Sequence, residues 1–275
     1  LYYDVPSGVL SGNTTYYWRV VVTTSNGVSF YQNPPYNFTT DVPGTISGAT
    51  FNDVNANSIR DGGEAGLSGW KIYVKNVENM HLDSAITGVT GTYLFSNIFH
   101  GSYIVSEFQQ DDWVQTVPSG IGLHEVTIIG GSGHSGIDFG NVAATKYVGP
   151  AAGNWSEPGN WVGNHLPGPT NPAVIPANAV VTVDALPSDS VLALRILGGG
   201  GLTFSHVIGR LKVASVVQID NNATMTFPSH IDSGGLICHA GLINRGTLNP
   251  GRSRITFAGD RHNVIVCDAG GSGGK

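Results

Sequence analysis

Short apolar runs separated by glycine, asparagine and proline recur along the whole chain and limit it to β architecture. Glycine supplies 39 of the 275 residues and charged residues only 12%, against about 7% and about 25% in average soluble proteins. Residues 71–74 and 102–108 alternate apolar and polar side chains, as half-buried strands do. No segment has helical periodicity. The sequence therefore predicts an all-β chain, with β-sandwich modules in tandem followed by a right-handed parallel β-helix-like solenoid.

Charge, hydropathy and cysteine content exclude several classes of protein. The formal net charge is −6, and the 13 Lys and Arg residues form no basic patch of the kind that binds nucleic acid. No apolar run reaches about 18 residues, so we expect no membrane span. Cys238 and Cys267 are too few for a disulfide scaffold, and the sequence leaves open whether they pair or are buried thiols.

The stretch D-V-N-A-N-S-I-R-D-G-G-E, residues 53–64, has the donor spacing of an EF-hand type calcium loop. Side-chain oxygens stand at positions 1, 3, 5, 9 and 12 of the loop, in Asp53, Asn55, Asn57, Asp61 and Glu64. The backbone carbonyl of Ile59 is available at position 7. A hard cation such as Ca2+ takes six to eight oxygen ligands, and alternate residues of a tight loop can supply them.

One position departs from this pattern, because Ser58 stands where such loops usually have glycine. A non-glycine residue at positive φ costs about 1–2 kcal/mol, so we expect a strained or differently wound turn and a weaker affinity. The alternative is an ordinary surface turn whose Asn and Asp side chains bond to their own backbone.

Several further motifs follow the loop in a recognisable order. They are G-L-S-G at 66–69, G-T-Y-L-F at 91–95, G-S-Y-I-V at 101–105 and D-F-G-N at 138–141. With the loop, they make residues 45–142 resemble the SdrD B-like relatives of Cna B-type domains, which are β-sandwich repeats of bacterial surface proteins. The resemblance implies a Ca2+ site at the six residues named above that stiffens the module. Residues 76–83 lack alternating oxygen donors, so we expect one site and not two.

Some Cna B-type domains also carry a Lys–Asn isopeptide bond promoted by a buried acid. Glu107 stands where such an acid could lie, but the first strand has no lysine and Lys71 belongs to the next strand, so we expect no cross-link. The predicted core of this module consists of Ile46, Phe51, Leu67, Trp70, Ile72, Val74, Tyr93, Phe95, Ile98, Tyr103, Val105, Trp113, Val126, Ile128 and Phe139.

These patterns divide the chain into three regions. Residues 1–41 are similar to the C-terminal half of a fibronectin type III domain, with an L-S-G-N-T-T-Y-Y-W-R-V corner at 10–20 and a hairpin turn at 25–27. The SdrD B-like sandwich occupies 42–145, after the D-V-P-G linker. Residues 146–275 form a β-solenoid fragment, truncated at its C-terminus, and we expect the whole chain to be part of a longer protein.

The solenoid is predicted from short strands at a roughly constant interval, each separated by Gly or Asn. The expected strands are 180–183, 191–197, 202–204, 211–219, 223–227, 236–239, 247–249, 255–258 and 264–266. The run Gly198–Gly201 is interpreted as a corner between strands. A jelly roll of similar strand count is the alternative fold.

Catalysis is the main alternative to a structural role, since parallel β-helices host polysaccharide lyases and hydrolases. The acids of the solenoid show no pair at neighbouring-turn spacing beside an aromatic platform, although a glycosidase needs two carboxyl groups about 5–9 Å apart. Trp155 and Trp161 either pack at the entry to the solenoid, which we favour, or stack on sugar rings.

We therefore expect a non-catalytic, structural or adhesive segment of a large secreted or surface-anchored bacterial protein. It would be an extracellular, Ca2+-stiffened spacer that presents a distal region for binding a glycan or a protein on a host or neighbouring cell. The alternative is the spacer and solenoid of a carbohydrate-active enzyme or a carbohydrate-binding protein.

Overall fold

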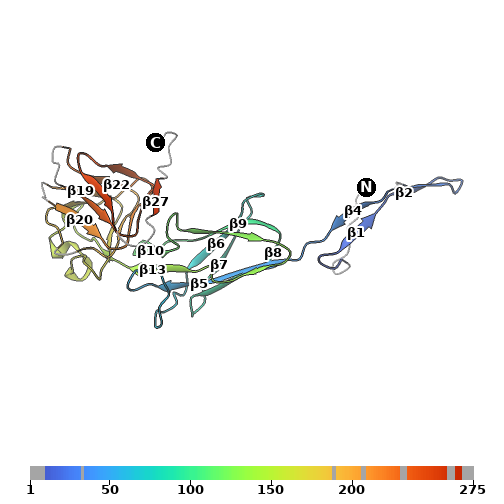
Figure 1. The fold of residues 1–275 in the computed structure, drawn as a ribbon, viewed down its shortest axis with the longest axis horizontal. Helices are drawn as coiled ribbons and strands as arrows, with labels where there is room; N and C mark the ends of the chain where they lie inside the picture. Colours follow the sequence, from blue (N-terminus) through green and yellow to red (C-terminus); the bar gives the residue numbers. More distant parts are fainter. Residues whose placement is uncertain are drawn as a thin grey trace.

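The computed structural model describes residues 10–31, 34–187, 190–205, 209–229, 234–258 and 264–267. Three parts follow one another along the long axis: a narrow N-terminal ribbon, a sandwich, and a solenoid (Figure 1). Apart from two 3-10 turns, η1 (Pro158–Asn160) and η2 (Val162–Asn164), the regular structure of these residues is all β strand. The predicted fold class is confirmed. None of the described helices is long and apolar enough to cross a membrane.

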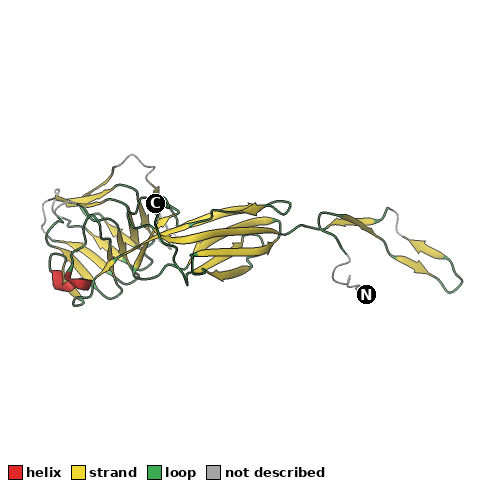
Figure 2. Cartoon of the chain, turned by 90° about the horizontal axis from the view of Figure 1, so that it is seen from below, coloured by secondary structure: helices red, strands yellow, loops and turns green. Residues whose placement is uncertain are grey.

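The N-terminal ribbon consists of two antiparallel strand pairs in succession. Strand β1 (Thr15–Trp18) pairs with β4 (Tyr36–Thr39), and β2 (Val21–Thr23) pairs with β3 (Ser29–Tyr31) across the expected hairpin. Gly27 takes φ +82° in this turn, which glycine adopts without strain. Trp18 stacks on Tyr36 at 4.9 Å between ring centroids, yet both rings are about half exposed. Among the described residues no second sheet covers the ribbon (Figure 2), and its likeness to fibronectin type III stays a prediction.

The sandwich packs two sheets face to face. The first contains β5 (Gly44–Asn52), β8 (Thr92–Ile98), β10 (Trp113–Val117), β12 (Gly133–His134) and β13 (Phe139–Ala143). The second has the order β11-β9-β6-β7, formed by Leu123–Ile128, Gly101–Glu107, Lys71–Asn76 and Leu82–Ile86. Strand β13 runs parallel to β5, with Phe139 opposite Thr50 and Asn141 opposite Asn52. This pairing brings the first and last strands of the module together beside the candidate calcium loop.

The predicted sandwich core is largely confirmed. Ile46, Ile72, Val105 and Phe139 are fully buried between the two sheets, with the other predicted residues around them. Leu67 and Trp113 are only half-buried, so their assignment to the core was wrong. Trp113 lies at the margin of the sandwich, where its ring meets the edge of the buried Trp70 ring at 5.6 Å.

The solenoid has three parallel sheets; the chain alternates between two of them in its first turns and passes through all three in the later ones. We call the first the seam sheet: β14 (Thr145–Lys146), β16 (Ala173–Ile175), β18 (Leu194–Ile196), β21 (Val216–Ile219), β24 (Gly241–Asn244) and β27 (Val264–Cys267). The outer sheet contains β15 (Ala152–Asn154), β17 (Val180–Val183), β19 (Gly201–Phe204), β22 (Thr224–Thr226) and β25 (Thr247–Asn249). The third sheet contains β20 (Gly209–Val213), β23 (Gly234–Cys238) and β26 (Arg254–Phe257).

Parallel pairing in register stacks equivalent side chains into columns. Ala173, Leu194, Val217 and Leu242 form one inward column of the seam sheet. On the outer sheet Thr182 and Thr203 stack outward, and their hydroxyl groups are 3.2 Å apart. The parallel pairing excludes the jelly-roll alternative, whose strands would pair antiparallel.

Two strand assignments in the solenoid need correction. Residues 211–219 form two strands of different sheets, β20 and β21, because the chain turns at Ala214 and Ser215. Strand β24 at 241–244 was not predicted. The Gly198–Gly201 corner is confirmed: Gly199 takes φ +85°, and a Cβ atom on Gly200 would lie 2.6 Å from the Pro176 carbonyl oxygen.

The seam sheet is covered on both faces, by the solenoid interior on one side and by the sandwich on the other. A shared apolar cluster joins Ala56, Val114 and Val142 of the sandwich to seam-sheet residues that include Val174 and Val216. Residues of this sheet are therefore buried at every position of β16, β18, β21 and β24. We call this contact region the seam.

Candidate metal centre

The candidate calcium loop, residues 53–64, leaves the end of β5 and is closed at its neck by backbone hydrogen bonds. Asp53 N–H donates to the Asn141 carbonyl on β13 at 2.8 Å, and Asn52 N–H donates to the Ala65 carbonyl at 2.9 Å. The loop is therefore held between the last strand of the sandwich and its own return segment.

Asp53 is fully buried and organises the first half of the loop. Its Oδ1 accepts a hydrogen bond from Asn57 N–H at 3.0 Å, and its Oδ2 accepts one from Ser58 N–H at 2.9 Å. Buried carboxylates need such partners, since an unpaired one is costly to desolvate. The side chain at position 1 thus fixes the backbone at positions 5 and 6.

Three of the predicted donor residues converge on one point. Asn55 Nδ2 and Asn57 Nδ2 both donate to Asp61 Oδ2, at 2.9 and 2.7 Å. The amide oxygens of the two asparagines accept from loop N–H groups: Asn55 Oδ1 from Asn57 N–H at 3.0 Å, and Asn57 Oδ1 from Ile59 N–H at 2.7 Å. The last two bonds are those that the ordinary-turn interpretation predicts.

Glu64 closes the second half of the loop. Its Oε1 accepts from Val54 N–H and its Oε2 from Asp61 N–H, both at 3.0 Å. The structure thus brings Asp53, Asn55, Asn57, Asp61 and Glu64 into one hydrogen-bonded loop. The Ile59 side chain is exposed, and the Ile59 backbone N–H donates to Asn57 Oδ1, whereas the prediction concerned the Ile59 carbonyl.

Ser58 occupies the left-handed region that glycine usually supplies at this position. Its φ is +66°, so the loop keeps the winding that the pattern requires and bears the cost of a side chain there. The Ser58 hydroxyl donates to the Thr116 carbonyl of β10 at 3.1 Å. Sequence reasoning missed this contact, because no local signal links residues so far apart in the chain.

The donor set fits a hard cation in its chemistry. Carboxylate and amide oxygens have several lone pairs, so the bonds to loop N–H groups leave acceptor capacity. A cation at the convergence point would take over from the two amide groups as partner of the Asp61 carboxylate. Among the described residues, no three His, Cys, Asp or Glu side chains gather as a metal-binding group. The predicted ligand set of this loop contains two side-chain amides and a backbone carbonyl in addition to its three acids.

Glu107, the acid considered for a cross-link, is buried at the same end of the sandwich. Its Oε2 accepts from Asn141 Nδ2 at 2.9 Å, while Glu107 Oε1 and Asn141 Oδ1 have no protein partner. Burial raises the pKa of Glu107 to about 8, against smaller opposing effects of Asn141 and Arg195. The Lys71 ammonium lies elsewhere, 4.9 Å from the centre of the Tyr73 ring.

The solenoid side chains considered for catalysis or sugar binding serve its packing. Trp155 and Trp161 are 2% and 1% exposed, and Trp161 Nε1 donates to the Trp155 carbonyl at 2.9 Å. Packing is therefore confirmed for both, and neither can stack on a sugar ring. Asp184 accepts two bonds from Ser156, and Asp220 pairs with Arg195 at 2.9 Å. Four further acids of the solenoid, Asp189, Asp232, Asp260 and Asp268, lie outside the described residues.

Cys238 is a buried free thiol on β23. Burial raises its pKa to about 12, which keeps it protonated and unreactive.

Residues 44–122 match the family model of the SdrD B-like domain. The match lies on the sandwich module that carries the loop, and it covers less than half of the chain. No curated protein sequence matches the chain.

Solved structures with similar parts include two major pilins and one further protein. The Bacillus anthracis TIE protein is 16% identical, with 48% of this chain and 24% of that chain covered and a TM-score of 0.30. The major pilin SpaD of Corynebacterium diphtheriae is 14% identical, covering 38% and 33%, with a TM-score of 0.28. BcpA, the major pilin subunit of Bacillus cereus, is 16% identical, covering 51% and 41%, with a TM-score of 0.30. The chain thus spans less than half the length of each, and TM-scores this low carry no inference about it.

Proposed function

We propose that this chain is a non-catalytic structural segment of a secreted or surface-anchored bacterial protein, in which Ca2+ stiffens the SdrD B-like sandwich. The segment would act as a spacer that presents a distal region to an extracellular glycan or a cell-surface protein. The observation that carries the proposal is the meeting of Asn55 and Asn57 at the Asp61 carboxylate, in a loop closed by Asp53 and Glu64 and carried by a module that matches the SdrD B-like family.

In this proposal the ligands are the side chains of Asp53, Asn55, Asn57, Asp61 and Glu64 and the Ile59 carbonyl. A bound cation would supply positive charge to three carboxylates held within one short loop. Asp53 orients the loop backbone through Asn57 and Ser58, and Glu64 ties its two ends together. Because a cation that binds only the folded loop stabilises the folded state by mass action, the sandwich would become stiffer when it is loaded.

The test is a thermal melt of the full chain in excess EDTA and again in about 5–10 mM CaCl2, which saturates a site of about 10⁻⁴–10⁻³ M. We expect the melting temperature to rise by several degrees with Ca2+. The rise should disappear in the double variant Asp53→Asn with Glu64→Gln. Asp83→Asn, which removes an exposed acid of the same module, is the matched control and should keep the rise.

Coincident melts of the wild-type chain with EDTA and with Ca2+ would mean that the loop is an ordinary turn. A rise that persists in the double variant would place the cation elsewhere. Mg2+ at the same concentration should give a smaller rise, because its smaller, octahedral shell suits a flexible loop of carboxylates and amides less well.

A further inference from the structure

The candidate loop has two faces, because its donors alternate with residues of a different kind. Asn55 and Asp61 are exposed on the outer face, whereas Ala56, between the two asparagines, is only 4% exposed. Ala56 and Ser58 both take left-handed φ angles, +51° and +66°. Ala56 is thus directed inward while its neighbour Asn55 stays exposed.

The second face of the loop lies against the solenoid. Ala56 belongs to the apolar cluster of the seam, together with Val174, Leu192 and Val216 of the solenoid. The Ser215 hydroxyl, at the turn between β20 and β21, donates to the Ala56 carbonyl at 3.3 Å. The loop is therefore part of the contact between sandwich and solenoid.

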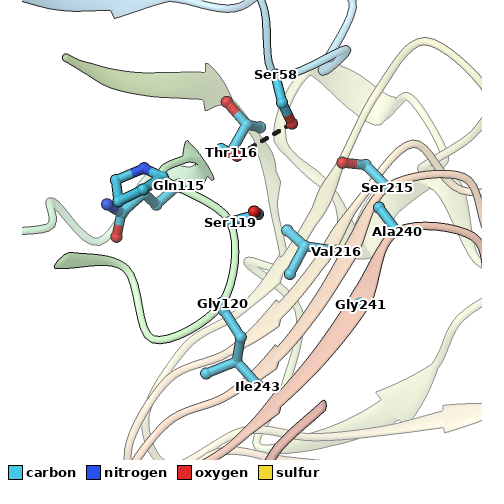
Figure 3. Close-up of a pocket in the computed structure, with 11 residues that line it drawn as sticks. Ser58, Gln115, Thr116, Ser119, Gly120, Ser215, Val216, Ala240, Gly241 and Ile243 are labelled. Atoms are coloured by element: carbon cyan, nitrogen blue, oxygen red, sulfur yellow. Dashed lines mark hydrogen bonds between the residues drawn. The ribbon is translucent and has the colours of Figure 1, made fainter. Parts of the chain in front are cut away.

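Little free space separates the loop from the solenoid. A cavity of about 20 Å³ remains at this point, with Ser58 and Thr116 of the sandwich on one side and Ser215, Val216 and Ala240 on the other (Figure 3). Such a volume holds about one water molecule. Because Ala56 itself is buried in the shared cluster, a shift of the loop backbone by 1–2 Å, on the order of a water radius, would have to displace solenoid atoms.

The donor face and the solenoid face are joined by the same short piece of backbone. Asp53 fixes Asn57 N–H and Ser58 N–H through its two carboxylate oxygens, and its carbonyl accepts from Ala56 N–H at 3.0 Å. Any ligand that orders Asp53 and Asn57 therefore also orders Ala56.

From this arrangement we propose that the 53–64 loop is a latch, through which cation binding in the sandwich strengthens the docking of the solenoid. This inference rests on the proposed calcium function and adds to it a second site of action, the seam. Because coupling between two sites is reciprocal, a chain with an undocked solenoid must bind Ca2+ more weakly, by the same factor by which Ca2+ favours docking.

The decisive experiment measures the Ca2+ dissociation constant of the full chain by isothermal titration calorimetry in the wild type and in Val216→Asp. Val216 is no ligand and lies in the solenoid, 9% exposed under the sandwich. We expect a charge there to loosen the seam and weaken Ca2+ binding at least fivefold, the lower end of typical coupling. Val180→Asp is the matched control, because Val180 is 41% exposed on the outer sheet, and it should leave the constant unchanged.

The outcomes separate the two ideas. Suppose that the wild type binds Ca2+ and that Val216→Asp, with native circular dichroism, binds it with the same dissociation constant. That result overturns the latch and leaves the calcium site standing. Wild-type chain that binds no Ca2+ overturns both.

A second measurement needs no variant, in case Val216→Asp fails to fold. Ser215 N–H donates to the Leu192 carbonyl, and Ala240 N–H donates to the Ser215 carbonyl, at the turns beside the seam. In the wild-type chain, hydrogen exchange of these two amides should slow at least fivefold with Ca2+. Thr203 and Thr224 amides of the outer sheet are the internal reference and should not change. Equal exchange of Ser215 and Ala240 with and without Ca2+ would contradict the latch.

Discussion

At the scale of single residues, Ser58 shows how one side chain both disturbs and supports the loop. Its φ of +66° belongs to the region where a Cβ atom costs about 1–2 kcal/mol. Its hydroxyl donates to the Thr116 carbonyl, a contact that contributes about 1 kcal/mol if it is typical. The two effects nearly cancel, which explains how a non-glycine residue is tolerated at position 6.

This balance predicts a difference between two small substitutions. Ser58→Ala keeps the Cβ cost and loses the hydrogen bond, whereas Ser58→Gly loses both. We expect Ser58→Gly to be more stable than Ser58→Ala by about 1–2 kcal/mol and close to the wild type, measured by urea unfolding. Equal stability of the two variants would mean that the left-handed conformation carries no cost here.

Glu107 carries a prediction about pH, because its folded-state pKa of about 8 lies above its ordinary value of 4.5. The folded protein keeps the Glu107 proton that the unfolded chain releases, so this group makes the folded state less stable as pH rises from about 4.5 to about 8. Each pH unit in that window lowers the free energy of unfolding by at most about 1.4 kcal/mol. Above pH 8 both states are ionised and the effect levels off.

The measurement is urea unfolding of wild type and Glu107→Gln at pH 5, 6.5 and 8. Glutamine keeps the shape and cannot ionise, so the variant should gain stability relative to wild type as pH rises. A stability difference that stays constant across the three pH values would contradict the raised pKa. Asp83→Asn, an exposed acid, serves as control and should show no such trend.

At the scale of elements, the seam sheet is held to the sandwich by a column of outward side chains. Pairing in register places Lys146, Val174, Arg195, Gln218 and Ile243 one above another. Arg195 Nη1 donates to the carbonyls of Gln110 and Trp113 at 2.8 and 3.0 Å. Gln218 Nε2 donates to Gln109 Oε1 at 2.8 Å. The segment before β10 is thus bound along several turns of the solenoid.

Two ion pairs in this column should differ in their effect on stability. Arg195 is buried and paired with Asp220, so Arg195→Met removes the cation that faces this carboxylate and the Arg195 bonds to two carbonyls, and it should cost about 3–5 kcal/mol. Lys146 meets Asp112 at 2.7 Å near the surface, and Lys146→Met should cost at most about 1 kcal/mol. Urea unfolding measures both.

A double-mutant cycle with Asp220→Asn isolates the Arg195 pair. The cost of Arg195→Met should shrink by at least about 1 kcal/mol in the Asp220→Asn background, since the stranded charge is gone. Strict additivity would show that the arginine acts through its carbonyl contacts alone.

At the scale of the whole molecule, sandwich and solenoid share one apolar cluster and so should unfold together. Neither Val174 nor Val142 stays buried if the two parts separate. We expect one calorimetric transition for both parts in the full chain, with a van't Hoff enthalpy close to the calorimetric one. Two resolved transitions in the wild type would contradict this. Trp18→Ala, in the uncovered ribbon, should leave the transition within about 0.5 kcal/mol of wild type.

Local patterns were enough to identify the elements. The alternating runs of the sandwich predict its core from Ile46 to Phe139, and the Gly198–Gly201 run predicts a corner, because strand periodicity and turn conformation are properties of adjacent residues. The spacing of residues 53–64 is likewise local, and the structure places Asp53, Asn55, Asn57, Asp61 and Glu64 in one hydrogen-bonded loop, while their role as ligands stays a prediction. The run 241–244 escaped prediction because G-L-I-N is too short and too uniform to show a period. The sequence predicted a single strand over 211–219, where the structure has two, because the turn between them, Ala214-Ser215, contains neither Gly nor Pro.

The sequence by itself determined an all-β chain with a solenoid, a sandwich and a donor loop at residues 53–64, since each follows from spacing within a short window. Tertiary structure alone decided that the sandwich covers one sheet of the solenoid. It also decided that Arg195 is buried against Gln110 and Trp113, and that Ala56 and Ser58 place the loop in the seam. The physical reason is that these contacts join residues far apart in the chain, and spacing within a short window does not specify which distant segment covers a sheet.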